Sequence, residues 1–262
     1  MITEEGKQNL ENFGFRLNRS GGHSARTIML EELEILFSYV EDTEAPKQSY
    51  IDAIVSENCL GKPSKNSQKI TSQIMSTMYG FDPNIPLFKL LRFFWAKDSQ
   101  GHGLLAALCA YVRDPIFRMC VPFILEVEKG TSVNKALLEE YIDKQETGRY
   151  SSTTLSSVSK NLNSSWTQAG YLIGRINKTR VDNEPTAANA AYAIIIAIML
   201  GHRGRTLFDS EPVKMLDCSP SKAIELSQQA SEKGWLVFKR IGDIIEVQIP
   251  NTFNFNTKGG IE

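Results

Sequence analysis

The chain has 262 residues, 29 Lys and Arg against 30 Asp and Glu, a formal net charge of −1 and a hydrophobic content of 42%. These values are typical of a globular protein of one or two domains that buries a sizeable core. They exclude nucleic-acid binding through overall charge, so any basic footprint must be local.

Cysteine usage and hydropathy indicate a cytoplasmic protein. Cys59, Cys109, Cys120 and Cys218 are scattered without a C-x-x-C pair, which favours reduced thiols over disulfides or zinc ligands. The first residues are polar and acidic, unlike a signal peptide. The most apolar run, 190–200, is too short to cross a bilayer, so we interpret it as a buried helix and expect no membrane association.

The beginning of the chain contains a basic, glycine-containing segment. We expect residues 1–24 to form a loosely structured leader arm. Around its Ser-Gly-Gly turn lie Arg16, Arg19 and Arg26 with no acidic residue among them. This arm could contact phosphates, or it could be a surface loop before a helix. His23 has no partner nearby in the sequence, and we interpret it as incidental.

Residues 25–146 show apolar side chains at helical spacing almost throughout. Ser64 fits an N-cap, and Asp114 and Pro115 fit an N-cap with proline at the first helical position. The pattern predicts helices over 28–40, 50–61, 64–78, 87–95, 104–112, 115–127 and 132–144. We see no strand pattern before residue 205 and expect a compact, all-helical bundle.

The next segment, 147–184, is locally basic. Its stretch 149–180 has no acidic residue, is rich in Ser, Thr, Asn and Gln, and has the five cations Arg149, Lys160, Arg175, Lys178 and Arg180. Hydroxyl, amide and cationic donors suit phosphate oxygens. Two short helices fit, over 154–162 and 165–176. We interpret this helix pair as a nucleic-acid contact, with a bridge between two domains as the alternative.

Residues 185–250 follow the element order of a winged helix. The pattern predicts an apolar helix over 185–201, a short strand over 205–208, and a second helix capped by Ser210. A third helix begins at Ser219 and Pro220 and ends at Gly234. Two alternating runs, 236–239 and 245–249, then form a hairpin. Residues 251–262 are expected to be a flexible tail.

The third helix of such modules usually enters the DNA major groove. The DNA contacts predicted here are Ser221, Lys222 and Gln228 on that helix, with Lys239 and Arg240 at the tip of the hairpin. Glu225 on the same helix argues against binding by phosphate contacts alone. Winged helices also serve as protein–protein adaptors.

The sequence contains no pattern that indicates catalysis. The three histidines are far apart, and no metal-binding spacing, phosphate loop or nucleophile elbow is present. We therefore predict no enzyme activity, no cofactor and no metal.

Several phrases together resemble the BrxA family of BREX bacteriophage-exclusion systems. They are Arg19-Ser-Gly-Gly-His-Ser, Ser56-Glu-Asn-Cys-Leu-Gly-Lys-Pro-Ser, the 91–98 helix, Arg113-Asp-Pro, and Asn163-Ser-Ser-Trp-Thr-Gln-Ala-Gly. The resemblance spans most of the chain as a diffuse pattern, and this chain is somewhat longer than the family. It implies a mainly α protein: a NusB-like helical domain followed by a winged helix with a small β-hairpin.

The resemblance also implies non-catalytic binding of double-stranded DNA within a defence complex, with other defence-system proteins as partners. Three alternatives stay open: a protein-interaction scaffold of that complex, an RNA-binding protein, and a winged-helix transcription regulator. The sequence does not determine the oligomeric state.

Overall fold

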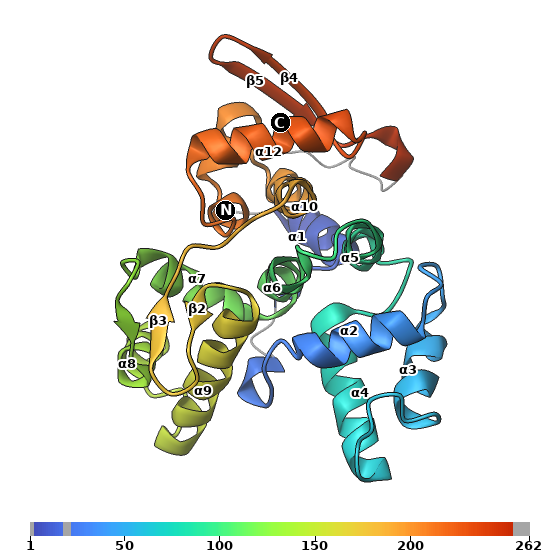
Figure 1. Cartoon of the computed structure of the whole chain (residues 1–262), viewed down its shortest axis with the longest axis vertical. Helices are drawn as coiled ribbons and strands as arrows, with labels where there is room; N and C mark the ends of the chain where they lie inside the picture. Colours follow the sequence, from blue (N-terminus) through green and yellow to red (C-terminus); the bar gives the residue numbers. More distant parts are fainter. Residues whose placement is uncertain (1–2, 18–21, 254–262) are drawn as a thin grey trace.

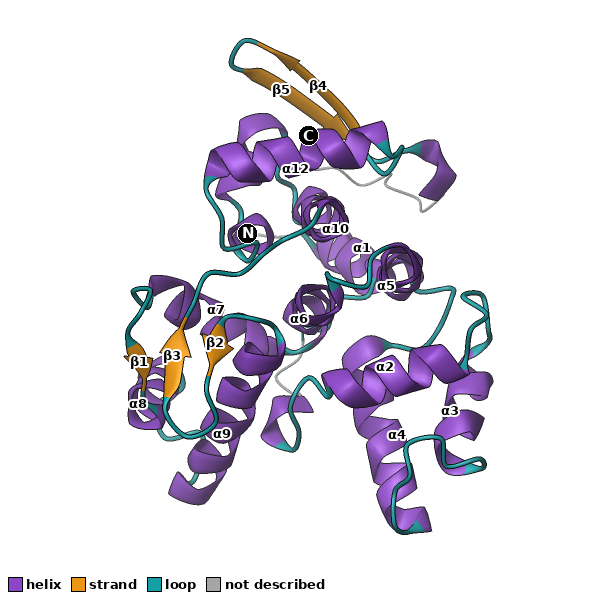
Figure 2. Ribbon diagram, viewed as in Figure 1, coloured by secondary structure: helices purple, strands orange, loops and turns teal. Residues whose placement is uncertain are grey.

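The computed structural model describes residues 3–17 and 22–253, which are mainly helical with two small antiparallel sheets (Figures 1 and 2). The first helices are α1 (Glu4–Phe13), α2 (Leu30–Tyr39), α3 (Lys47–Val55), α4 (Lys65–Tyr79), α5 (Pro86–Lys97), α6 (His102–Arg113) and α7 (Pro115–Glu126). Next come β1 (Ser132–Val133), α8 (Lys135–Gln145), α9 (Ser152–Gln168), β2 (Leu172–Ile173) and β3 (Lys178–Arg180). The chain continues with α10 (Ala187–Met199), α11 (Glu211–Lys214), α12 (Pro220–Glu232), β4 (Val237–Ile241) and β5 (Ile244–Gln248).

Local capping chemistry determines where several helices begin. The Ser64 hydroxyl accepts a hydrogen bond from the Ser67 amide at the start of α4, as predicted. The Asp114 carboxylate accepts from the Ile116 and Phe117 amides at the start of α7, with proline at the first position. These polar signals are local, so the sequence located both helices correctly.

The prediction of a loosely structured leader arm is wrong for residues 4–13. Residues 4–13 form helix α1, capped by Thr3, and its Leu10 and Phe13 are buried in the core. The helix has few apolar side chains, and contacts with the rest of the core hold it in place. Arg19 lies outside the described residues.

The prediction of no strand before residue 205 is also wrong. Strand β3 pairs with β1 on one side and β2 on the other, so that residues far apart in sequence form one small sheet. These strands have two or three residues each, too few to show an alternating pattern. The predicted helix pair is correspondingly one helix, α9, followed by the β2–β3 hairpin.

Helix α10 is the centre of the C-terminal half and is buried along its length, as predicted. It packs against α5 and α6 on one side and α11 and α12 on the other. The Tyr192 hydroxyl donates to the Leu87 carbonyl at 3.1 Å, and the Asn189 side chain donates to the Gly101 carbonyl at 2.9 Å. The two halves of the chain therefore share one core. Among the residues that the structure describes, no helix combines the length and apolar character needed to span a membrane.

The end of the chain follows the predicted order with two corrections. Residues 204–209, predicted to include a strand, form a 3-10 helix, η2 (Gly204–Asp209), against which β5 packs. Gly204 has a φ of +56° and lies close to the Ile245 carbonyl, so the chain turns there instead of extending. Residues 251–253, predicted as flexible tail, form a short turn whose Phe253 ring contacts Phe93 and Phe94. The rest of the predicted tail lies outside the described residues.

Candidate nucleic-acid interface

Helix α12 presents one face to the core and the opposite face outward. The Ser219 hydroxyl accepts from the Lys222 amide, and Pro220 occupies the first position, as predicted. The buried side of the helix packs on α10. The exposed side chains are those of Ser221, Lys222, Glu225, Gln228 and Glu232. The three predicted contacts on this helix are therefore all accessible.

The charge on the outer face of α12 is largely balanced. The Lys222 amine lies 2.8 Å from a Glu225 carboxylate oxygen, and the Gln229 side-chain amide donates to the same oxygen at 3.1 Å. A lysine held by its own helix neighbour offers less to a phosphate than an unpaired one. The face is therefore rich in hydrogen-bonding groups without being strongly basic.

The β4–β5 hairpin stands beside α12 and contains both predicted cations (Figure 1). Lys239 and Arg240 are exposed, and Lys239 lies directly opposite Glu246 in the strand register. Arg240 Nε donates to the Gly242 carbonyl at 3.0 Å. A groove of about 460 Å³ runs between the helix and the hairpin, lined by Gln228, Ser231, Glu232, Phe238 and Arg240.

The tip of this hairpin is apolar. Ile241 and Ile244 face each other across the turn and are 81% and 75% exposed. Exposed pairs of large aliphatic side chains suggest a contact surface more than a solvated turn. The tip and the cations beside it thus offer two different kinds of contact.

The predicted cations of 149–180 have different environments. Lys160 on α9 and Arg175 in the β2–β3 turn are exposed. Arg149 is bound to Glu146 at 3.0 Å and lies over the Tyr150 ring. The Lys178 amine is half-buried and donates to the Thr167 hydroxyl, and burial lowers its pKa. Only part of this stretch is therefore free to meet a ligand.

Arg180 is fully buried, and the prediction that it contacts DNA is wrong. Its two terminal nitrogens lie 2.8 and 2.6 Å from the two carboxylate oxygens of Asp217, and its Nε donates to the Ile124 carbonyl at 3.0 Å. Burial opposes the charge on Asp217, but hydrogen bonds from Arg180 and Lys129 outweigh it and lower the pKa of that carboxyl. Arg180 thus joins the β2–β3 hairpin to the turn before α12.

The predicted contacts do not form one surface. Figure 1 places the β4–β5 hairpin at one end of the long axis of the molecule and α9 toward the other. Of the predicted arm, Arg26 is exposed, whereas Arg16 is half-buried and its carbonyl accepts from Arg118 at 2.9 Å. The predicted cations of 149–180 therefore do not share one surface with those of α12 and its hairpin, and α12 with its hairpin is a separate candidate.

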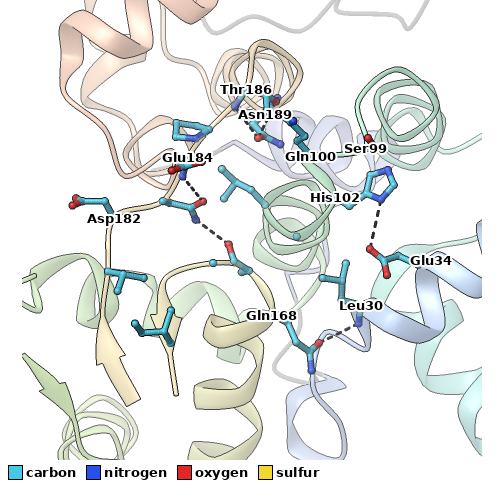
Figure 3. Close-up of a pocket in the computed structure, with 18 residues that line it drawn as sticks. Leu30, Glu34, Ser99, Gln100, His102, Gln168, Asp182, Glu184, Thr186 and Asn189 are labelled. Atoms are coloured by element: carbon cyan, nitrogen blue, oxygen red, sulfur yellow. Dashed lines mark hydrogen bonds and ion pairs between the residues drawn. The ribbon is translucent and has the colours of Figure 1, made fainter. Parts of the chain in front are cut away.

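A wide cleft of about 870 Å³ lies where the two halves meet, between α2, the start of α6 and the segment 181–186 (Figure 3). Its lining includes Glu34, Asp182 and Glu184 but no lysine or arginine. The His102 ring stacks on Trp95 at 3.8 Å and approaches Glu34 at 3.7 Å. An acidic cleft repels phosphates, so it separates the basic parts of the surface instead of connecting them.

Three interior residues have the spacing of a Ser–His–Asp arrangement that the sequence did not reveal. His23 Nδ1 donates to Asp114 at 2.9 Å, and its Nε2 lies 2.9 Å from the Ser165 hydroxyl. That hydroxyl already donates to the Asn161 carbonyl and accepts from the Ile28 amide.

This arrangement is structural. His23 and Ser165 have no exposed surface and Asp114 has 1%, so no substrate reaches the hydroxyl. Burial raises the pKa of Asp114, but the charge and hydrogen bonds of His23 outweigh it and lower that pKa to about 2. The interpretation of His23 as incidental is wrong. Its hydrogen bonds to Asp114 and Ser165 hold residues 22–28 against α7 and α9. Partners 91 and 142 residues away left no local signal.

Comparison of the sequence with known proteins does not show which family the chain belongs to. No protein-family model and no curated protein matches the sequence. Within residues 3–17 and 22–253, no group of three His, Cys, Asp or Glu side chains is placed to hold a metal ion. The interface must therefore be argued from its own residues.

Proposed function

We propose that this protein binds double-stranded DNA without catalysis, through a winged-helix module made of α10, η2, α11, α12 and the β4–β5 hairpin. In this proposal α12 lies in the major groove and the hairpin lies along the neighbouring backbone. The preceding helices would correspond to a NusB-like domain. A role in phage defence, beside other defence proteins, rests on the resemblance to the BrxA family alone.

The observation that supports this function best is the unpacked face of α12 beside an exposed hairpin. A helix that packs one side on α10 and leaves Ser221, Lys222 and Gln228 outward can enter a groove without unfolding anything. Gln228 also lines the groove beside Arg240, so an amide that can read a base lies next to a cation that can hold a phosphate.

The balanced charge of this surface determines the expected affinity. Lys222 is paired with Glu225, and Lys239 lies opposite Glu246, so few phosphates can be neutralised. Because each neutralised phosphate releases counterions, the dependence of affinity on salt should correspond to only a few contacts. Specificity would then depend on hydrogen bonds to base edges.

The test is fluorescence anisotropy with a labelled duplex at several salt concentrations. For the double variant Lys239→Ala/Arg240→Ala we expect about tenfold weaker binding and a salt slope reduced by about 2. The matched control is Lys160→Ala/Arg175→Ala, which removes the same charge from exposed positions outside the module. The proposal fails if wild type does not bind, or if the control loses as much affinity as the hairpin variant.

A protein-interaction scaffold is the second candidate, and the apolar hairpin tip favours it. Ile241 and Ile244 expose more aliphatic surface than a DNA backbone contact requires. For the double variant Ile241→Ser/Ile244→Ser this function predicts loss of co-purification with other defence proteins while duplex binding is unchanged. Retention of every partner by that variant would remove the tip from consideration.

A further inference from the structure

A groove of about 670 Å³ on another part of the molecule, between α3 and α4, has the chemistry of an anion site. Lys65, at the start of α4, donates to the carbonyl of Val55, the last residue of α3, at 2.8 Å, so the two helices run antiparallel. Lys47 therefore lies near the α4 residues Ser76 and Thr77, and Lys69 lies near the end of α3. The groove has one lysine toward each end.

These two lysines differ from those surface lysines that are held by a carboxylate. Lys62, Lys89, Lys135, Lys144 and Lys222 each lie within 3.2 Å of a glutamate carboxylate oxygen. Lys47 and Lys69 make no ion pair with any residue that the structure describes, and no carboxylate lines the groove between them. The groove is thus lined by two exposed lysines that no carboxylate neutralises.

The wall of the groove formed by α4 contains hydrogen-bond donors that nothing in the chain uses. Ser72 is only 5% exposed and lines the groove, yet its hydroxyl makes no hydrogen bond with the described part of the chain. That hydroxyl is therefore available to a ligand that enters the groove. Gln73, Ser76 and Thr77 add further donors along the same wall.

The wall formed by α3 adds a helix end and apolar surface. Helix α3 begins after Pro46, which provides no side-chain cap, so the partly positive end of the helix dipole lies near Lys47. Ile51 and Val55 cover the rest of that wall. The groove therefore combines cations, donors and a non-polar side, which suits a ligand whose charged groups are joined by a less polar part.

We propose that the α3–α4 groove binds the phosphate groups of an extended ligand, one at each lysine, with the α4 hydroxyls donating between them. Seven residues of α4 separate the level of Lys47 from that of Lys69, about 10 Å along the helix at 1.5 Å per residue. At the rise that a strand has within a double helix, about 3.4 Å per nucleotide, the spacing spans about three nucleotides. The ligand is a single nucleic-acid strand or a free polyphosphate.

This site is independent of the proposed DNA interface. Figure 1 shows α3 and α4 far from α12 and its hairpin. An experiment can therefore show duplex binding by the module without phosphate binding at the groove, or phosphate binding at the groove without duplex binding by the module. The variants Lys239→Ala/Arg240→Ala should leave binding at the groove unchanged.

The test uses the full chain and two probes, a fluorescein-labelled single-stranded heptanucleotide and inorganic tripolyphosphate. For Lys47→Gln/Lys69→Gln we expect about tenfold weaker binding, and for wild type a salt slope near −1.4 on the oligonucleotide, from two contacts on a single strand. The matched control is Lys89→Gln/Lys144→Gln, which removes two exposed lysines that have glutamate partners. Ser72→Ala should weaken binding by a smaller factor.

The outcomes separate the two sources. Binding of the oligonucleotide that depends on Lys47 and Lys69 identifies a nucleic-acid strand, and binding of tripolyphosphate alone with the same dependence identifies a free polyphosphate. Amide chemical shifts of the wild-type protein, mapped with tripolyphosphate, should change along α3 and α4 even if a variant folds poorly. Failure of both probes to bind, equal loss in the control, or shifts elsewhere on the molecule would overturn the proposal.

Discussion

In the stretch 149–180 the most strongly bound cation is directed inward, whereas in α12 and the β4–β5 hairpin the cations are directed outward. Arg180 is fully buried against Asp217, and α9 is held by the Ser165–His23–Asp114 contacts. Lys222, Lys239 and Arg240 are exposed, and Lys222 and Lys239 lie beside glutamates of their own helix or hairpin. The first stretch looks more basic in sequence, but the second is the better candidate surface, because accessibility depends on what lies opposite a charge.

The largest expected effect is a loss of stability when the buried partner of Arg180 is removed. Asp217→Ala leaves the buried Arg180 guanidinium without its carboxylate, and removing one partner of a buried ion pair costs about 3 kcal/mol. Urea unfolding should show this loss. Asp243→Ala, which breaks an exposed pair with Arg205, is the control and should leave the midpoint unchanged. Equal effects would mean that burial does not distinguish the two regions.

The second prediction concerns pH. The pKa of Asp114 is lowered from 3.8 to about 2 in the folded chain, so its ionised form adds about 2 kcal/mol of stability at neutral pH. Because the folded pKa is the lower one, this contribution is complete above about pH 4 and is lost as the pH falls toward 2. Asp114→Asn should therefore be less stable than wild type at pH 7, and the difference in unfolding free energy should shrink in acid. A constant difference across that range would contradict the assignment.

The third prediction compares the two regions through matched helix caps. Ser151 caps α9 and Ser219 caps α12, each accepting a hydrogen bond from the amide three residues on. Replacing either serine with alanine should cost about 1 kcal/mol, measured by thermal or chemical unfolding. The caps are chemically alike, so a much larger loss in one variant would reveal that the corresponding helix depends more on its cap than on its packing.

The smallest expected effect lies on the outer face of α12. Lys222→Gln removes an exposed pair between neighbours on one helix, worth about 0.3 kcal/mol to stability. Its effect on duplex affinity should be smaller than that of Lys239→Ala/Arg240→Ala, because Glu225 already neutralises Lys222. Anisotropy on the same duplex measures both. A larger loss for Lys222→Gln would shift the main contact from the hairpin to the helix.

The sequence by itself determined the elements that depend on neighbouring residues. Ser64, Asp114 and Ser219 as caps, the buried character of α10, and the hairpin after Gly234 were all predicted correctly, since capping and periodicity act within a few residues. Tertiary structure alone decided which polar side chains meet across the core. Arg180 became a buried partner of Asp217, His23 became a buried partner of Asp114 and Ser165, and residues 204–209 coiled beneath β5. Such pairs form wherever the fold brings a donor and an acceptor together out of water. Because the two residues can be any distance apart in the sequence, no sequence pattern predicts them.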